Sequence, residues 1–450
     1  MNEFELGKIL DFSETVEFNL PKNIILIWKD SLKPEVILAD RMSDIPHHWL
    51  RGNSSLKILG EFESIKAILK SFTLPPGSKV IDIQEGSVIN FSLVEKAIRY
   101  QGKRLKRVVV VDDSPTIRKL LMKIIEQFSD WKVVAEVENA LGIEKAIDEF
   151  YPDLITLDLN LGEMNGAKAM KKYIAPHQIP TILITSQNIK DGGLVLEALD
   201  AGAIDYIQKP ESGKWSDTSE DLKLKMEIAL KSKWKKLIIN HRPKAPKLNL
   251  QYDLNKFIIL IGSSTGGTQA LQEIFVNLPQ NIPPILVTQH IPKGFSKALA
   301  DRLNSLCPFE IKEAVHGDEI KPNRILIAPG DHHMKLAHNG NQVLIVDEAP
   351  INRFRPSVEA MFSSFKNYKK HQIISIMLTG MGKDGSSAML ELRKNGAFNI
   401  AQDEQSSVVF GMPKEAIRIG AAQYIKPLQE IADFLPELMS ELSKKSKSAS

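Results

Sequence analysis

The sequence predicts an α/β protein with two doubly wound parallel sheets and an additional α/β segment at its N-terminus. Residues 105 to about 212 alternate short apolar runs with amphipathic stretches, a pattern typical of a doubly wound sheet. A second such series extends from about residue 253 to residue 440 and begins with the apolar run Phe257–Ile261. The breaker-rich stretch His241–Lys247 separates the two series. Two separate cores are therefore expected.

Length, charge and cysteine content narrow the possible classes of protein. A chain of 450 residues is too long for one core. The net charge of +3 gives no support to nucleic-acid binding, and the single cysteine, Cys307, excludes an intrachain disulfide. The N-terminus lacks a signal-peptide pattern, and no stretch approaches the roughly 20 apolar residues that span a bilayer. We expect a cytoplasmic protein without membrane insertion.

Composition predicts five segments along the chain. They are an N-terminal segment (1–104), a first α/β domain (105–215), a helix followed by a linker (216–252), a second α/β domain (253–440) and a disordered tail (441–450).

The N-terminal segment allows two interpretations. Pro34–Asp40 resembles Pro152–Asp158, and Lys79–Gln84 resembles Ala203–Gln208, so the segment could be a shortened copy of the first α/β domain. Glu85 stands at the position that Lys209 occupies in the first α/β domain. A carboxylate at that position would repel a phosphate group instead of binding it. The alternative is an unrelated small α/β adaptor. In either case we expect docking rather than chemistry.

The second α/β domain carries a candidate nucleophile. Gly262, Ser264 and Gly266 fit G-x-S-x-G, a strand-to-helix turn that exposes a serine hydroxyl. An ordinary β–α turn also contains such residues. His290 and Asp384, however, follow two later apolar runs, and the carboxyl ends of parallel strands meet in one crevice. The three residue types are those of a serine hydrolase. The neighbouring Ser263 is the rival nucleophile, but it lies off the centre of the motif.

The first α/β domain ends its strands in charged and hydroxyl side chains. Asp112 and Asp113 follow one apolar run, Asp158 follows the next, and Thr185 and Lys209 close two more. Gathered at one edge, the three carboxylates would repel one another unless a cation lay between them. Hard oxygen ligands favour Mg²⁺. The cluster predicts a magnesium site in which Asp158 accepts a phosphoryl group.

Residues 105–212 resemble a response-regulator receiver domain in the blocks VVVVDDSPTIRKLL, PDLITLDLNLGEMNG, TILITS and GAIDYIQKP. The resemblance implies a flavodoxin-like sheet, phosphorylation by a histidine kinase and Mg²⁺ dependence. Gly162 and Asn165 stand where the family has proline and aspartate. The implied roles are phospho-acceptor (Asp158), acid pair and metal ligands (Asp112, Asp113), backbone metal ligand (Asn160), switch residues (Thr185, Tyr206) and phosphate-pairing lysine (Lys209).

Residues 255–430 resemble the catalytic domain of CheB protein-glutamate methylesterases in the blocks IGSSTGGTQA, TQHIPKGFSKALADRLN, NRFRPSVEAMF and LTGMGKDG. The resemblance implies that Ser264, His290 and Asp384 hydrolyse glutamate methyl esters on chemoreceptors, and deamidate particular glutamines, without a cofactor. It also implies that the Met381 N–H binds the oxyanion and that Thr265 helps to position the histidine. The order of receiver, linker and esterase is that of the family.

A different class of function stays open. Many receivers control binding modules, so the chain could be a phosphorylation-gated interaction protein with an idle esterase pocket. A nucleotide-binding site is disfavoured because Ser264 stands at the second glycine position of G-x-G-x-x-G. Methanol release from methylated receptors separates the enzyme from the binding module.

Overall fold

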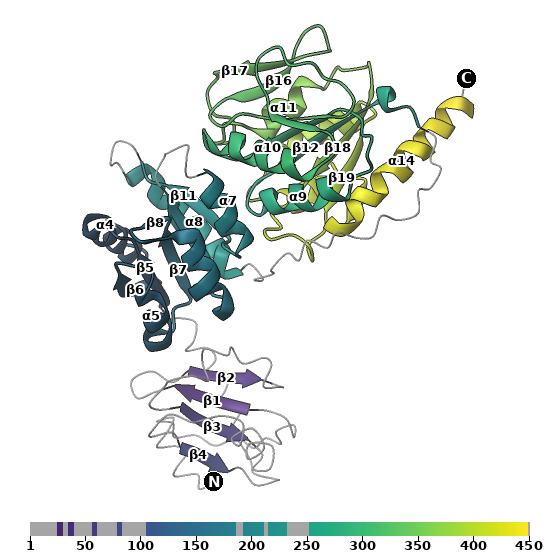
Figure 1. Cartoon of the computed structure of the whole chain (residues 1–450). Coiled ribbons are helices and arrows are strands. Elements are labelled where there is room, and N and C mark those ends of the chain that lie inside the picture. Colours follow the sequence, from purple (N-terminus) through teal and green to yellow (C-terminus); the bar gives the residue numbers. More distant parts are fainter. Residues whose placement is uncertain are drawn as a thin grey trace. The chain divides into compact units, whose positions relative to one another are not determined.

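The computed structural model describes residues 105–185, 192–210, 215–231 and 252–448, together with four strands nearer the N-terminus (Figure 1). The chain forms two compact units. The first comprises Met1–Thr156, Leu161–Met164 and Lys172–Ile179, and the second comprises Leu157–Asn160, Asn165–Lys171 and Pro180–Ser450. The described strands form three main sheets, which we call the N-terminal, central and C-terminal sheets.

The N-terminal sheet has four strands in the order β2-β1-β3-β4: β1 (Ile25–Lys29), β2 (Glu35–Ala39), β3 (Leu56–Gly60) and β4 (Lys79–Asp82). Strand β1 pairs antiparallel with both β2 and β3, and only β3 and β4 pair in parallel. Only residues 30–34 join β1 to β2, which is too short for the crossover that a parallel pair requires. This mixed pairing differs from the all-parallel sheet of a receiver copy.

The central sheet has the order β11-β10-β7-β5-β6, and its β5–β6 and β10–β11 pairs are parallel. This is the strand order of flavodoxin-like sheets. Its elements are β5 (Lys106–Val111), α4 (Pro115–Glu126), β6 (Trp131–Val137), α5 (Gly142–Phe150), β7 (Leu154–Asp158), β8 (Asn160–Leu161), β9 (Met164–Asn165), α6 (Gly166–Ala169), a π-helical turn (Met170–Ile174), a 3₁₀ turn (Ala175–His177), β10 (Thr181–Thr185), α7 (Gly192–Asp200), β11 (Asp205–Gln208) and α8 (Ser216–Lys231).

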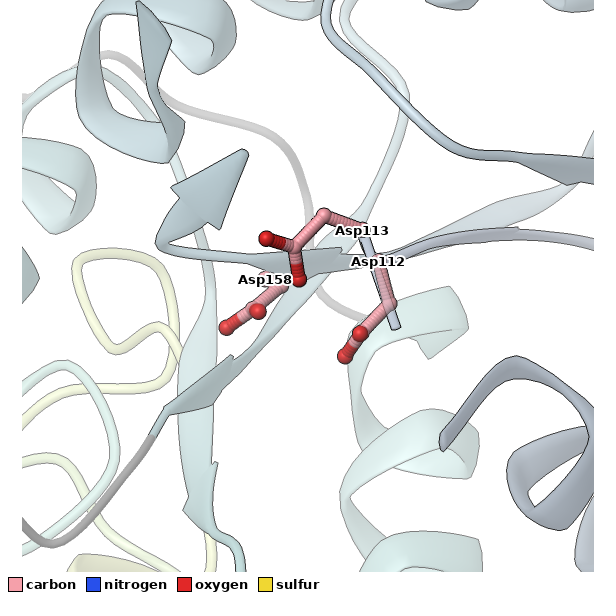
Figure 2. A group of neighbouring side chains, drawn as sticks. All are labelled: Asp112, Asp113 and Asp158. Carbon is pink, nitrogen blue, oxygen red and sulfur yellow. The ribbon is translucent and has the colours of Figure 1, made fainter. Parts of the chain in front are cut away.

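Local sequence explains how the acidic edge of this sheet is built. Strand β5 ends in four buried valines, and Ser114 then caps α4 by accepting a hydrogen bond from the Ile117 N–H, with Pro115 at the first helical position. Asp112 and Asp113 therefore lie in the short turn between strand and helix. Figure 2 shows both side chains beside Asp158 at the end of β7.

The C-terminal sheet has the order β14-β15-β13-β12-β18-β19-β20, and every neighbouring pair is parallel. The prediction of a second doubly wound parallel sheet is confirmed. Its elements are a 3₁₀ turn (Leu254–Lys256), β12 (Phe257–Ser263), α9 (Gly267–Asn277), β13 (Ile285–Gln289), α10 (Phe295–Leu306), β14 (Glu310–Glu313), β15 (Arg324–Ile327), the β16–β17 hairpin (His333–Leu336, Val343–Val346), α11 (Val358–Ser364), β18 (Gln372–Met377), α12 (Ser386–Lys394), β19 (Phe398–Gln402), α13 (Met412–Arg418), β20 (Tyr424–Lys426) and α14 (Leu428–Ser448).

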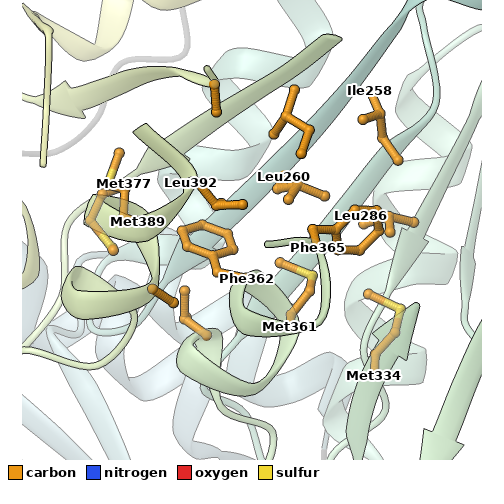
Figure 3. Close-up of a cluster of buried hydrophobic side chains, with 14 of the residues drawn as sticks. Ile258, Leu260, Leu286, Met334, Met361, Phe362, Phe365, Met377, Met389 and Leu392 are labelled. Atoms are coloured by element: carbon orange, nitrogen blue, oxygen red, sulfur yellow. The ribbon is translucent and has the colours of Figure 1, made fainter. Parts of the chain in front are cut away.

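A large hydrophobic core packs one face of this sheet against α11 and α12. Phe362 and Phe365 lie against Leu260 and Leu286 of the central strands, and all four side chains are at most 1% exposed (Figure 3). Each such side chain stabilises the fold by about 1.5–3 kcal/mol through burial. This core supports the strands β12 and β18, whose carboxyl ends are considered below.

The C-terminal helix corrects one expectation. Residues 441–450 were expected to be disordered, but α14 continues to Ser448 and so includes most of that segment. Leu435, Leu438 and Met439 are buried, and the helix packs on α9. The Lys-rich end extends the helix because cationic side chains near a helix C-terminus are favourable, and Lys445 pairs with Glu441 one turn earlier.

Two further observations concern other helices. Helix α8 occupies part of the segment expected as helix and linker, and residues 232–251 lie outside the described residues. Among the helices that the structure describes, none has the length and apolar character needed to cross a membrane.

Candidate functional site

The candidate nucleophile lies where strand order reverses in the C-terminal sheet. Strand β12 is buried along its whole length and ends at Ser263, so Ser264 is the first residue beyond it. The Ser264 N–H donates to the carbonyl of Thr379, which follows the neighbouring strand β18, at 3.0 Å. Gly266 adopts φ 76° and is the N-cap residue of α9. The helix N-terminus therefore lies close to Ser264, where its dipole favours negative charge.

The two adjacent serines have different surroundings. Ser263 is 0% exposed, and its hydroxyl donates to Gln289 Oε1 at 2.6 Å. Gln289 in turn donates from Nε2 to the Ser264 carbonyl at 2.9 Å. Ser264 is 8% exposed and lines a cavity of about 690 Å³ that also contains His290 and Met381. The surroundings favour Ser264 as the residue that meets a substrate.

His290 and Asp384 form a hydrogen-bonded pair beside Ser264. Strand β13 brings His290 there, since its last residue, Gln289, lies in register with Ser263 of β12. His290 Nε2 lies 2.8 Å from a carboxylate oxygen of Asp384, which is 0% exposed. His290 Nδ1 is buried and has no hydrogen-bond partner within the described residues. It is therefore the ring nitrogen left to take a proton.

The loop of residues 352–357 and the start of α11 hold Asp384 in place, a role that the sequence analysis did not predict. Asn352 and Ser357 donate to Asp384 Oδ1 at 2.9 and 2.8 Å, and the Val358 N–H donates to Oδ2 at 2.7 Å. Burial by itself would raise the pKa of this carboxylate. The hydrogen bonds from His290 and from the loop outweigh burial, so the pKa of Asp384 lies below its usual value. The carboxylate stays ionised and orients the imidazole.

The same loop also touches the imidazole itself. The phenyl ring of Phe354 stacks on His290 with a centroid separation of 3.7 Å and an interplanar angle of 7°. Asn352 and Arg353 have φ values of 53° and 72°, in the left-handed region that few non-glycine residues adopt. The sequence signal was the block NRFRPSV, which carries an asparagine, a ring and a serine within six residues.

The glycine-rich loop after β18 closes the other side of the site. A Cβ at Gly380 would lie 2.7 Å from Ser264 Cβ and 2.5 Å from Met412 Sδ, so only glycine allows this approach. Met381 follows and lines the same cavity as Ser264.

Thr265 differs from expectation. It was expected to help position the histidine, but its hydroxyl donates to the carboxylate of Asp205 at the start of β11. A carboxylate is the stronger acceptor, because a charge-assisted hydrogen bond is roughly twice as strong as a neutral one. Lys225 of α8 also lies 3.5 Å from Asp205. Thr265 therefore ties the turn beside Ser264 to β11.

The acidic edge of the central sheet meets the requirements of a cation site. Asp112, Asp113 and Asp158 can offer one carboxylate oxygen each, all within 4.8 Å of one another. Asp112 and Asp158 are buried, and Asp113 is exposed. Lys209 Nζ lies 2.9 Å from Asp158 Oδ2. Three hard oxygen donors with one exposed member fit a partly hydrated Mg²⁺.

Thr185 and Asn160 also lie at this edge of the central sheet, whereas Tyr206 lies within β11. Thr185 is the buried last residue of β10, and exposed Asn160 follows Asp158 by two positions. Asn165 caps α6 through its side chain. The Tyr206 ring is buried and meets Phe295 of α10 edge-on, with centroids 5.5 Å apart. Burial, together with the nearby acidic side chains, raises the pKa of Tyr206 well above its usual value, so its hydroxyl stays neutral.

Comparisons with known proteins find matches for both α/β domains. Residues 259–435 match the CheB methylesterase family model, and residues 108–214 match the response regulator receiver domain model. The chain is 40% identical over 335 residues to the protein-glutamate methylesterase/protein-glutamine glutaminase of Chromohalobacter salexigens, covering 72% of this chain and 94% of that protein. It is 37% identical over 334 residues to the protein of the same name from Salmonella typhimurium, covering 72% and 95%.

Two solved structures are also similar to parts of this chain. The CheB methylesterase catalytic domain of Thermotoga maritima is 44% identical and covers 40% of this chain and 97% of its own, with a TM-score of 0.39. The response regulator domain of Thermotoga maritima CheB is 32% identical and covers 29% and 99%, with a TM-score of 0.26.

Proposed function

This chain belongs to the CheB family of protein-glutamate methylesterases, and from that premise we propose that Ser264, His290 and Asp384 hydrolyse glutamate methyl esters on chemoreceptor proteins. The observation that carries the assignment of residues is the buried His290–Asp384 pair beside Ser264, at the point where strand order reverses. In open α/β sheets this is the edge where ligands bind.

The ester bond is cleaved in two steps. Ser264 Oγ bonds to the ester carbonyl carbon while its proton passes to His290 Nδ1, and the resulting oxyanion lies near the Met381 N–H and the start of α9. The intermediate collapses, and methanol leaves with the proton from His290. Water then attacks the acyl-serine with His290 as base, which releases the glutamate carboxylate and restores Ser264. Asp384 stabilises the imidazolium throughout.

The Ser264–His290 hydrogen bond is not formed in the structure, since Nδ1 lacks a partner. Such bonds are often long or poorly aligned before substrate binds and tighten in the complex. The same attack on a side-chain amide would release ammonia instead of methanol. We therefore include deamidation of particular receptor glutamines in the proposal.

The receiver domain is proposed to control this activity. A histidine kinase would donate a phosphoryl group to Asp158, with Mg²⁺ held by Asp112, Asp113, Asp158 and the carbonyl of Asn160. When bound, Mg²⁺ would neutralise the charge of the incoming group. Lys209 pairs with Asp158 in the structure, and this contact supports the proposal that it would pair with a phosphoryl oxygen.

Contacts of β11 suggest how phosphorylation reaches the esterase site. Asp205 accepts a hydrogen bond from Thr265, next to the nucleophile, and Tyr206 packs on Phe295. Residues of β11 and α8 also line the cavity that contains Ser264. We propose that the switch residues Thr185 and Tyr206 reorient on phosphorylation and loosen these contacts. The receiver (105–215) and the esterase domain (253–440) would then separate enough to admit a receptor helix.

A cytoplasmic location is part of the proposal, because kinase phosphorylation and a free Cys307 both fit a reducing compartment. The test is methanol release from methylated receptor membranes, with and without a phospho-donor. Release that increases with the donor supports the proposal. A chain that binds receptor but releases no methanol in either condition would instead be a phosphorylation-gated interaction module.

A further inference from the structure

The contact between Phe354 and His290 has no role in the chemistry described so far. The two rings are parallel within 7°, and their centroids lie 3.7 Å apart. The His290 side chain is only 7% exposed. No other described residue is recorded as stacking on this imidazole.

The geometry favours one charge state of the histidine. Two neutral aromatic rings prefer offset or edge-to-face arrangements, because their electron-rich faces repel each other. A cation over an aromatic face is attracted by the same charge distribution. A close parallel stack is therefore better suited to the imidazolium than to the neutral imidazole. His290 becomes an imidazolium in the transition state of each step.

The loop that carries Phe354 keeps the ring in place. Ile351 and Phe354 exchange two backbone hydrogen bonds of 3.1 and 2.9 Å, which closes a tight turn. Asn352 and Arg353 adopt left-handed conformations, which non-glycine residues keep only where the surroundings impose them. Asn352 also donates to Asp384. One turn thus sets both the carboxylate and the aromatic face that act on His290.

We propose that Phe354 is a positioning residue for His290, which holds the imidazole plane against Asp384 and stabilises its protonated form during catalysis. The kinetic part of this inference rests on the proposed function. The stacking itself does not, because it can be observed without a substrate.

Other charged groups near His290 differ from Phe354 in their effect. Asp384 contacts Nε2 and accepts its own hydrogen bonds from Ser357 and Val358. Arg355 pairs with Asp331 and Asp347, and the Arg353 side chain is 88% exposed. From β11, Asp205 is engaged by Thr265 and Lys225. From α8, Glu220 and Asp221 line the same cavity as His290. None of these groups is altered by changing Phe354 to another uncharged residue.

The kinetic test compares Phe354→Leu with Phe354→Tyr in the full chain. We expect Phe354→Leu to lower kcat by about 2- to 30-fold with KM within about twofold. The direction follows because the imidazolium that forms in each transition state loses its attraction to the ring face. Phe354→Tyr keeps the face and should stay within about twofold of the unaltered chain in both readouts.

Two outcomes of this test would overturn the proposal. Equal losses of kcat in the leucine and tyrosine variants would mean that Phe354 only packs the loop. A rise in KM alone would make the ring a substrate contact. Phosphoryl labelling of Asp158 and the thermal unfolding midpoint serve as folding controls, and Phe354→Met replaces the leucine variant if the latter unfolds.

A second measurement needs no substrate, so it separates failure of this inference from failure of the proposed function. In histidine-labelled protein, the ring current of Phe354 should shift the His290 imidazole protons upfield, and Phe354→Leu should remove that shift while Phe354→Tyr keeps it. The His290→Gln spectrum assigns the resonance. Identical His290 shifts in the unaltered and leucine chains would refute the stack, whether or not methanol is released.

Discussion

Ser263 and Ser264 offer a matched pair of substitutions with opposite expected effects. Ser264→Ala removes the group that attacks the ester, and loss of a triad member typically costs on the order of 10⁴ to 10⁶ in rate. Its hydroxyl makes no recorded hydrogen bond within the described residues, so the unfolding free energy should change by less than about 0.5 kcal/mol.

Ser263→Ala should have the opposite pattern of effects, with lower stability and little loss of activity. It removes the donor to Gln289 Oε1 in a fully buried position, and a buried acceptor left unsatisfied costs about 1–3 kcal/mol. For a domain of this size, each 1 kcal/mol lowers the unfolding midpoint by about 2–4 °C. Activity should stay within about tenfold, because Gln289 still donates to the Ser264 carbonyl from its other end.

The assay measures two quantities for each variant: methanol release from methylated receptor membranes, and the unfolding midpoint by calorimetry. The expected result is crossed, with an inactive but stable Ser264→Ala chain and an active but less stable Ser263→Ala chain. An inactive Ser263→Ala variant beside an active Ser264→Ala variant would refute the assignment of the nucleophile. Loss of activity in both at unchanged stability would mean that the turn acts as a unit.

Three further predictions concern phosphorylation, control and pH. Asp158→Asn should abolish the base-labile phosphoryl label, as should removal of Mg²⁺ by chelation, while basal hydrolysis changes little; a label that persists in this variant would point to another acceptor. A fragment of residues 250–450 should hydrolyse ester about 10- to 100-fold faster than the unphosphorylated full chain, since a domain contact worth about 1.4 kcal/mol corresponds to tenfold; equal rates for the fragment and for both phosphorylation states would rule out occlusion. Asp384 has a pKa below its usual value of 3.8, so its contribution to stability is present above that value and is lost as pH falls through the folded-state pKa. Asp384→Asn should therefore flatten the loss of stability as pH falls below 3.8, and an unchanged acid-unfolding curve would contradict the hydrogen-bonding account.

The pattern of apolar runs predicted the two parallel sheets, whereas the composition of the last residues did not predict the helical end of α14. Both parallel sheets follow from apolar runs separated by amphipathic stretches, and the family assignment agrees with them. The antiparallel β1–β2 pair was also readable in principle, because only residues 30–34 connect the strands. The helical end of α14 was not, since a lysine- and serine-rich composition fits both a solvated helix end and a disordered tail.

The sequence by itself determined which chemical groups stand at the carboxyl edges: a serine, a histidine and an aspartate on one sheet, and three aspartates and a lysine on the other. It could do so because parallel strands bring their carboxyl ends to one edge of the sheet. Residues that directly follow the apolar runs are therefore expected to lie close together. Only the tertiary structure decided which neighbour each group meets. His290 and Asp384 are 94 positions apart, and Thr265 and Asp205 are 60. Such contacts depend on loop paths and side-chain directions, and these follow from packing of the whole chain. For that reason Thr265 meets Asp205 instead of His290, and Phe354 lies on the imidazole.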